Sequence, residues 1–308
     1  LGKFNFILID ATFYKKKWRE MVYEIYQRNK TFTLYVHCPL KICLERNKLR
    51  KNPLPEKVIH IIHHQLEKPK HPDLEIDTKK TELSKATSLI LAEIIKREYF
   101  RDGNLLPLLK KWGTLYSKEL GINLDSAKSS EIFKWFLASL LFGARISETI
   151  AKNTYQALKK HNLLTPKKII RAGWDFLVQT IMKEGGYVRY DEKTSDELLK
   201  VSKQLLEKYE GDLNQLHLKA QNARDLEQKL QEFYGVGPVT CRIFLRELRG
   251  IWKKANPKPG RFVKLAAEKL GIPSSLDSLK RYWQKHKVKN HDFRNFEVAL
   301  LRLGKNLF

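Results

Sequence analysis

The feature that most constrains the fold is a pair of amphipathic helical segments joined by a glycine-rich turn. Apolar residues recur at helical spacing from Leu226 to Leu248, and Tyr-Gly-Val-Gly-Pro at 234–238 interrupts them once. Two glycines around one apolar residue permit a tight turn, and proline suits the first position of the helix that follows. The sequence therefore predicts a helical hairpin whose turn exposes backbone N–H groups.

Such a turn, followed by a helix N-terminus, can hold a phosphate without any side chain. We predict that Gly235, Val236 and Gly237 form this contact, with Val236 tucked between the two helices. Thr240 would add a hydroxyl in the first helical turn, and Arg242 a cation on the face that it shares with Arg246. Contacts of this kind hold the backbone of a nucleic acid and do not depend on base sequence.

The charge of the chain agrees with a polyanionic partner. Lys and Arg total 59 against 34 Asp and Glu, a formal net charge of +25. Release of counterions from a nucleic acid is a common physical use of such an excess. A lysine-rich, solvated surface is the alternative. We expect nucleic acid as the partner, with duplex DNA first and RNA as the other possibility.

The region from 104 to 308 has helical spacing almost throughout, after a linker at 101–104. Ser147, Thr165-Pro166 and Asp225 mark helix starts. We expect helices near 105–120, 130–143, 147–161, 166–171, 174–184, 193–209, 213–220, 225–233, 239–249, 261–270, 275–285 and 291–303.

Together with the hairpin, two further segments carry a family resemblance. Phe136–Arg145, which precedes the helix from Ser147, and Gly185–Tyr190 resemble the endonuclease III-like, helix-hairpin-helix DNA glycosylases. The resemblance implies an all-α, two-lobed domain that flips a base out of duplex DNA. By the resemblance, the protein is a DNA-binding member of this base-excision-repair superfamily, and N-glycosylase activity on damaged DNA is its expected chemistry.

The resemblance also shows what this chain lacks. The family's Schiff-base lysine matches Val239, so no lyase activity is expected. The family's catalytic Asp has no counterpart, because the loop 251–261 contains no carboxylate. Asn256 is the nearest polar residue there, and Asp191 is a candidate from the other lobe, with capping of the helix from Lys193 as the alternative. No cysteine lies at the C-terminus, so no iron–sulfur cluster is expected.

The first hundred residues have a different pattern. We predict strands at 4–10, 31–36 and 74–76 with helices at 15–29 and 81–99, a βαβ arrangement typical of parallel sheets. The fold class is thus an α/β fragment over 1–100 followed by the all-α domain. Asp10 would end a buried strand, where P-loop proteins hold Mg²⁺. Arg46 and Arg50, one helical turn apart, could both bind phosphates.

Four segments of this region resemble the seryl-tRNA(Sec) kinase branch of the P-loop kinases: Ile9–Tyr14, His37–Leu40, Cys43–Asn47 and Leu66–Pro69. By this resemblance Asp10 is the Mg²⁺-side carboxylate, and Arg46 and Arg50 lie in the lid. No segment reads G-x-x-x-x-G-K-[ST], so ATP and Mg²⁺ are expected only if such a loop completes the domain. The region is either part of a longer chain or a remnant scaffold. The alternative function is therefore an ATP-dependent kinase acting on tRNA, RNA or a small molecule.

The cysteines suggest neither a disulfide framework nor a metal site. Cys38, Cys43 and Cys241 form no C-x-x-C pair, and we expect buried thiols of a reducing compartment. No metal is expected at the histidines of 60–64. No apolar run reaches the roughly 20 residues that span a bilayer, so we expect a cytoplasmic protein without a membrane partner.

Overall fold

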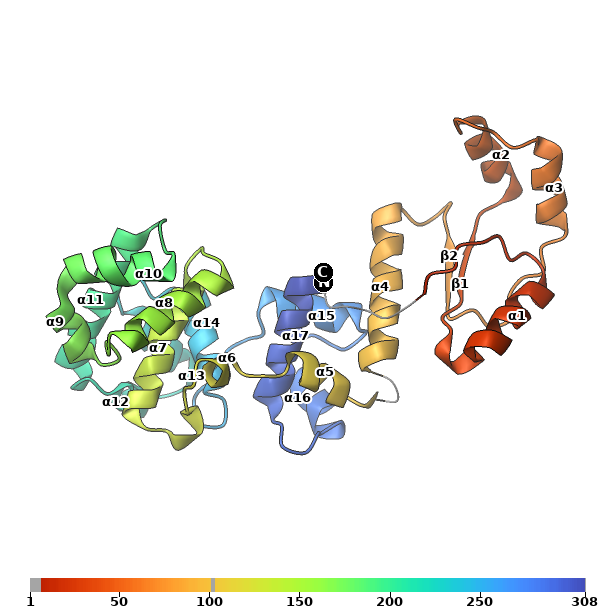
Figure 1. The fold of residues 1–308 in the computed structure, drawn as a ribbon. Helices are drawn as coiled ribbons and strands as arrows, with labels where there is room; N and C mark the ends of the chain where they lie inside the picture. The colour runs from red at the N-terminus through yellow and green to blue at the C-terminus, as the bar shows by residue number, and fades with distance from the viewer. Residues whose placement is uncertain (1–6, 101–102, 308) are drawn as a thin grey trace.

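The computed structural model describes residues 7–100 and 103–307 and is mostly helical, with a small parallel sheet near the N-terminus. Figure 1 shows three bodies in a row: the sheet with its helices, a group containing the C-terminal helices, and a larger helical group. The N-terminal elements are α1 (Lys16–Tyr26), η1 (Arg28–Lys30), β1 (Leu34–His37), α2 (Leu40–Lys48), α3 (Glu56–His64), β2 (Leu74–Asp77) and α4 (Leu83–Tyr99).

β1 and β2 are parallel neighbours, with Leu34 opposite Leu74 and His37 opposite Asp77. These strands confirm the predictions at 31–36 and 74–76. The strand predicted at 4–10 falls partly outside the described residues. Its remainder, 7–10, forms no strand, and Leu8 is 83% exposed. That part of the prediction is wrong, because an apolar run becomes a strand only where a neighbour takes its backbone hydrogen bonds.

α4 joins the sheet to the helical region. It contacts β2 on one side, and α5 and α15 on the other. Ile95 and Tyr99 are 0% and 4% exposed and belong to the same buried cluster as the helices that follow. The ring of Tyr99 lies 4.9 Å from that of Trp112 in α5.

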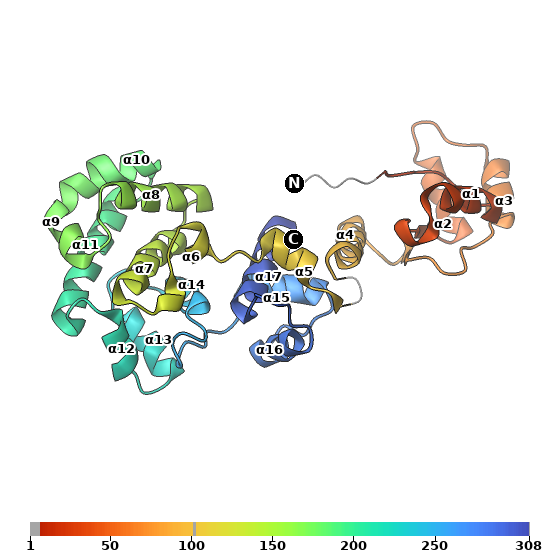
Figure 2. The same ribbon diagram turned by 60° about the horizontal axis from the view of Figure 1, so that its bottom comes forward.

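The elements from residue 103 onward form two helical lobes. They are α5 (Leu106–Trp112), α6 (Tyr116–Glu119), η3 (Leu124–Ser126), α7 (Ser129–Gly143), α8 (Glu148–Lys160), α9 (Pro166–Phe176), η4 (Leu177–Met182), α10 (Lys183–Gly185), α11 (Asp191–Tyr209), α12 (Leu213–Lys219), α13 (Ala223–Gln231), α14 (Pro238–Glu247), α15 (Arg261–Lys269), α16 (Leu276–Lys285) and α17 (Phe293–Leu307). In Figures 1 and 2, α5 and α15–α17 form one lobe and α7–α14 the other.

Local signals place the helix starts well. Ser147 accepts a hydrogen bond from the Ile150 N–H at 3.2 Å, and Thr165 accepts one from Lys168 N–H at 3.3 Å, as predicted. The helix before the hairpin starts two residues earlier than predicted, because Asn222 caps it. None of the described helices is long and apolar enough to cross a membrane.

A close approach of two helices fixes the hairpin on its lobe. A Cβ atom on Gly143, the last residue of α7, would lie 2.0 Å from the hydroxyl oxygen of Thr240 in α14. Only glycine permits this contact. It brings the loop after α7 next to the N-terminus of α14.

Candidate nucleic-acid interface

The hairpin has two glycines that serve different purposes. Gly235 has a φ of +77°, which favours glycine, and a Cβ there would lie 2.6 Å from the side chain of Glu197. Gly237 has φ −92° and ψ 177°, which any residue can adopt. A Cβ on Gly237 would meet nothing within 4 Å. The space in front of the N-terminus of α14 is therefore open.

Some backbone N–H groups of the turn and of the first turn of α14 have no partner among the described residues. The Val236 N–H donates to the carbonyl of Phe233 at 3.1 Å, and the Val236 side chain is 5% exposed, between the helices as predicted. In residues 7–100 and 103–307, no protein acceptor binds the N–H of Gly235 or Gly237. The first N–H of α14 that bonds back along the helix is that of Cys241, to Gly237. The turn and the first helical turn thus offer unpaired donors.

Cations border the opening. Arg242 is partly exposed, and its Cδ lies 3.4 Å from the ideal Cβ position of Gly260. Lys258 and Arg261 are exposed on either side of that glycine. Arg145 is exposed two residues after Gly143, which touches α14. Since no Asp or Glu occurs from 248 to 267, this part of the surface is positively charged.

The adjoining helix α11 contributes an aromatic ring contact and a carboxylate. Tyr234 is 44% exposed, and the ammonium of Lys200 lies 4.0 Å from its ring centre. The backbone N–H of Tyr234 donates to Gln204 at 2.9 Å, which holds the turn against α11. Burial raises the pKa of the Glu197 carboxyl group above its ordinary value. This carboxylate beside Gly235 would repel a bound phosphate.

Replacing Glu197 should therefore strengthen the binding of a polyanion. We expect Glu197→Gln to raise the affinity about three- to fivefold, the effect of removing roughly 1 kcal/mol of repulsion at water-like screening. In the parent chain, lowering the pH through the raised pKa of Glu197 neutralises the same charge. The affinity advantage of Glu197→Gln should then shrink as the pH falls. Fluorescence anisotropy at several pH values measures both effects, and a variant that binds more weakly at neutral pH contradicts the placement.

Two of the predicted α14 residues point inward. Thr240 is 5% exposed and packs against Gly143, so its hydroxyl is covered. Arg246 is 6% exposed, and its guanidinium lies 5.6 Å from the ring of Tyr116. Arg242 alone of the α14 arginines reaches the surface. The face expected to hold both arginines is split, because α6 and α17 cover the C-terminal part of α14.

The two catalytic candidates lie apart. Asp191 occupies the first turn of α11 and is partly exposed. Asn256 lies in the loop after α14, where its side-chain oxygen accepts from Arg249 at 3.1 Å and Lys280 at 2.8 Å. Across the described part of the chain, no hydrogen bond or ion pair joins either residue to the hairpin. Asp191 belongs to the helix itself, which starts earlier than the predicted Lys193.

A buried ion pair that the sequence did not reveal organises the loop after α14. The Arg249 Nε lies 2.8 Å from a Glu297 carboxylate oxygen, and their side chains are 6% and 1% exposed. Arg249 also donates to the carbonyl of Pro257. These partners lie 48 residues apart in the chain, so no local pattern could indicate the pair. Arg249 thereby positions the basic loop that borders the hairpin.

The predicted nucleotide residues are exposed and separate. Arg46 in α2 donates to the hydroxyl and carbonyl oxygens of Thr78 at 2.7 and 2.8 Å. Arg50 lies beyond the end of α2 at Lys48, so the two arginines do not share a helix as predicted. Asp10 is exposed and outside any strand, which corrects its predicted place at the end of a buried strand. In the described residues, no ion pair or hydrogen bond links these three side chains.

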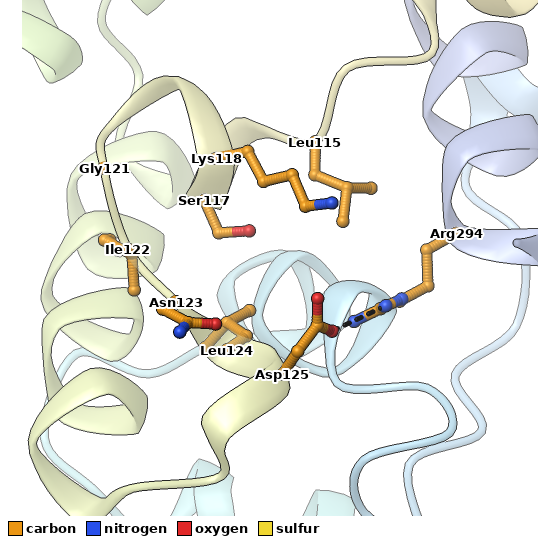
Figure 3. A pocket seen from close by; sticks show the side chains of 9 residues that line it. All are labelled: Leu115, Ser117, Lys118, Gly121, Ile122, Asn123, Leu124, Asp125 and Arg294. Atoms are coloured by element: carbon orange, nitrogen blue, oxygen red, sulfur yellow. Dashed lines mark hydrogen bonds and ion pairs between the residues drawn. The ribbon is translucent and has the colours of Figure 1, made fainter. Parts of the chain in front are cut away.

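A pocket of about 260 Å³ lies between the lobes, next to α6, η3 and α17. Figure 3 shows the Arg294 guanidinium meeting the Asp125 carboxylate at one side of it, at 2.8 Å. Arg294 also donates to the carbonyl of Glu247 at 3.2 Å. The Glu247 carboxylate is fully buried and accepts from the N–H groups of Tyr116 and Ser117, each at 2.9 Å. These contacts join the two lobes.

Comparison with known proteins finds partial similarity to one enzyme. The chain is 38% identical over 69 residues to L-seryl-tRNA(Sec) kinase of Homo sapiens, covering 21% of this chain and 19% of the relative. It is 36% identical over 69 residues to the kinase of the same name from Mus musculus, covering 21% and 18%. The chain thus spans less than a fifth of the length of these curated relatives. No family model matches, and no solved structure matches. The similarity supports the kinase-like N-terminal part and gives no support to a glycosylase relationship.

Proposed function

We propose that the helical region binds the sugar-phosphate backbone of a nucleic acid at the hairpin. The observation that carries the proposal is the open space in front of Gly237 at the N-terminus of α14, together with the N–H groups of Gly235 and Gly237, which bind no acceptor among the described residues. A helix N-terminus attracts anions, and exposed turn amides add directed donors. Arg242, with Arg145 beside the same helix start, supplies charge that neutralises phosphates.

Duplex DNA is the nucleic acid that we propose as the ligand. Backbone contacts suit duplex DNA, and the helix-hairpin-helix pattern favours it. The similarity to a kinase named for a tRNA makes folded RNA the ligand to compare with it. A more specific proposal is the release of bases from damaged DNA, and it rests on the sequence resemblance alone. Strand cleavage is not proposed, because Val239 stands where the resembling family has its Schiff-base lysine.

Binding should depend on salt and on the cations beside the hairpin. We expect the logarithm of the affinity to fall linearly with the logarithm of salt concentration, by about 0.9 for each phosphate contacted on duplex DNA. The double variant Arg145→Gln/Arg242→Gln should flatten this slope by about one to two units. Anisotropy titrations with labelled duplex DNA, duplex RNA and a tRNA transcript measure it.

A matched control removes the same charge elsewhere. Lys79 and Lys80 are exposed in the N-terminal body, and Lys79→Gln/Lys80→Gln lowers the net charge equally. This control should leave the slope nearly unchanged. If both double variants flatten the slope equally, the binding is a diffuse charge effect and the hairpin proposal is wrong.

A second candidate function is phosphoryl transfer by the N-terminal body, which the partial identity with the two kinases favours. Arg46 lies at the C-terminal edge of the parallel strands, where phosphate groups bind in open α/β sheets. ATP and Mg²⁺ binding would need a G-x-x-x-x-G-K-[ST] loop, which these 308 residues do not contain. Transfer of labelled phosphate to tRNA by a chain carrying such a loop tests this candidate. Loss of transfer in Arg46→Gln would support the role of Arg46, and undiminished transfer would exclude it.

A further inference from the structure

The N-terminal body places two thiols in direct contact. The Sγ atoms of Cys38 and Cys43 lie 3.0 Å apart. Cys38 follows the last residue of β1, and Cys43 lies in the first turns of α2, with Pro39 between the two elements. Both cysteines are partly exposed, which corrects the expectation that all three thiols are buried. Cys241, 3% exposed, fits that expectation.

We propose that Cys38 and Cys43 form a reversible intramolecular disulfide that fastens the start of α2 to the end of β1. A disulfide brings its sulfur atoms to about 2.05 Å, so the pair has to close by about 1 Å. Small rotations of two partly exposed side chains supply such a movement. The bond would close a short ring, within which Pro39 already restricts the backbone.

The surroundings fix the order of the chemical steps. Burial, together with a hydrogen bond to Cys38, raises the pKa of the Cys43 thiol to about 11. Cys43 is therefore the harder of the two thiols to deprotonate, and we assign the first attack to Cys38. With glutathione disulfide as the oxidant, Cys38 forms a mixed disulfide and releases one glutathione thiolate. Cys43 then loses its proton, attacks Cys38 Sγ and releases the second glutathione, so two protein thiols are oxidised and one disulfide is reduced.

The bond would act on a segment that non-covalent contacts already hold. Arg46 fastens α2 to Thr78 just after β2, and the Thr78 N–H donates to the carbonyl of His37 at 2.9 Å. A covalent link at the other end of α2 would hold this helix at two points. Helix α2 should then open less often, and its amide hydrogens should exchange more slowly.

The experiment treats the full chain with glutathione disulfide, then denatures it and alkylates it with iodoacetamide. The reduced chain takes three adducts. We expect the oxidised chain to take one, at Cys241, and to lose about 2 Da as two thiols become a disulfide. Cys241→Ser should still lose two hydrogens. Cys43→Ser should retain a glutathione adduct at Cys38, whereas Cys38→Ser, which lacks the attacking thiol, should retain little glutathione. The proposal is wrong if the parent chain gains only glutathione adducts, or if its disulfide includes Cys241.

Hydrogen exchange tests the fastening of α2. Peptides covering Leu40–Lys48 should exchange at least several-fold more slowly in the oxidised chain than in the reduced chain. Cys241→Ser should show the same slowing, and Cys43→Ser should show none on the same treatment. Unchanged exchange in an oxidised chain that carries the bond overturns the fastening.

Discussion

Replacing Gly237 by aspartate should reduce nucleic-acid affinity at least tenfold without destabilising the protein. The backbone at this position suits any residue, and a Cβ would enter open space. As the N-cap of α14, an aspartate accepts hydrogen bonds from the first helical N–H groups. The free energy of unfolding with aspartate at this position should differ from that with glycine by only a few tenths of a kcal/mol. The same carboxylate occupies the donors proposed for phosphate and repels it, and each 1.4 kcal/mol of repulsion lowers affinity tenfold.

Asparagine is the matched control at this position, because it caps a helix about as well and carries no charge. We expect Gly237→Asn to bind more tightly than Gly237→Asp and more weakly than the parent chain. Thermal unfolding should give nearly equal midpoints for all three chains. Equal affinities at equal midpoints would show that the ligand does not approach the N-terminus of α14.

The second large effect concerns the buried Arg249–Glu297 pair. Arg249→Met should destabilise the protein by about 3–5 kcal/mol, because it leaves the Glu297 carboxylate buried without its cation. For a chain of this size the unfolding midpoint should fall by roughly 10 °C. The loop at 249–257 also loses its anchor at Pro257, so nucleic-acid binding should weaken at temperatures where the variant is still folded.

A double-mutant cycle separates the pair from packing losses. Glu297→Met alone should be destabilising to a similar degree, since Arg249 is then buried without a counter-charge. The double variant Arg249→Met/Glu297→Met should recover much of the stability, because two apolar side chains replace a desolvated ion pair. Strictly additive losses in the double variant would contradict a direct interaction.

The helical part of the fold could be predicted closely, because helix signals are local. Spacing of apolar residues and caps such as Ser147 fix most helix bounds within two or three residues. The strand at 4–10 failed over its described residues 7–10, since a strand depends on partners that the sequence does not name. The shared role of α4 was also not predictable. β2 is its neighbour in the sequence, but its contacts with α15 involve residues far away in the chain.

Some residues of the candidate site could likewise be predicted from the sequence, and others could not. Gly235, Val236 and Gly237 could be placed from sequence, because a glycine-rich turn between two amphipathic helices is a local pattern and Gly235 adopts a positive φ. The inward turn of Thr240 could not, since it depends on where α7 crosses α14. Glu197 was missed as well. Nothing in the chain around it indicates that a carboxylate on α11 lies beside a glycine almost 40 residues later.

α4 has a consequence for any attempt to separate the two ends of the molecule. The sequence suggests a cut near residue 101, yet this would remove Ile95 and Tyr99 from a core to which they contribute, and uncover Trp112. Each product would expose an apolar stripe that now lies between them, a surface prone to aggregate. Helix α4 thus belongs to both parts of the molecule, and a fragment meant to retain nucleic-acid binding should start ahead of Leu83.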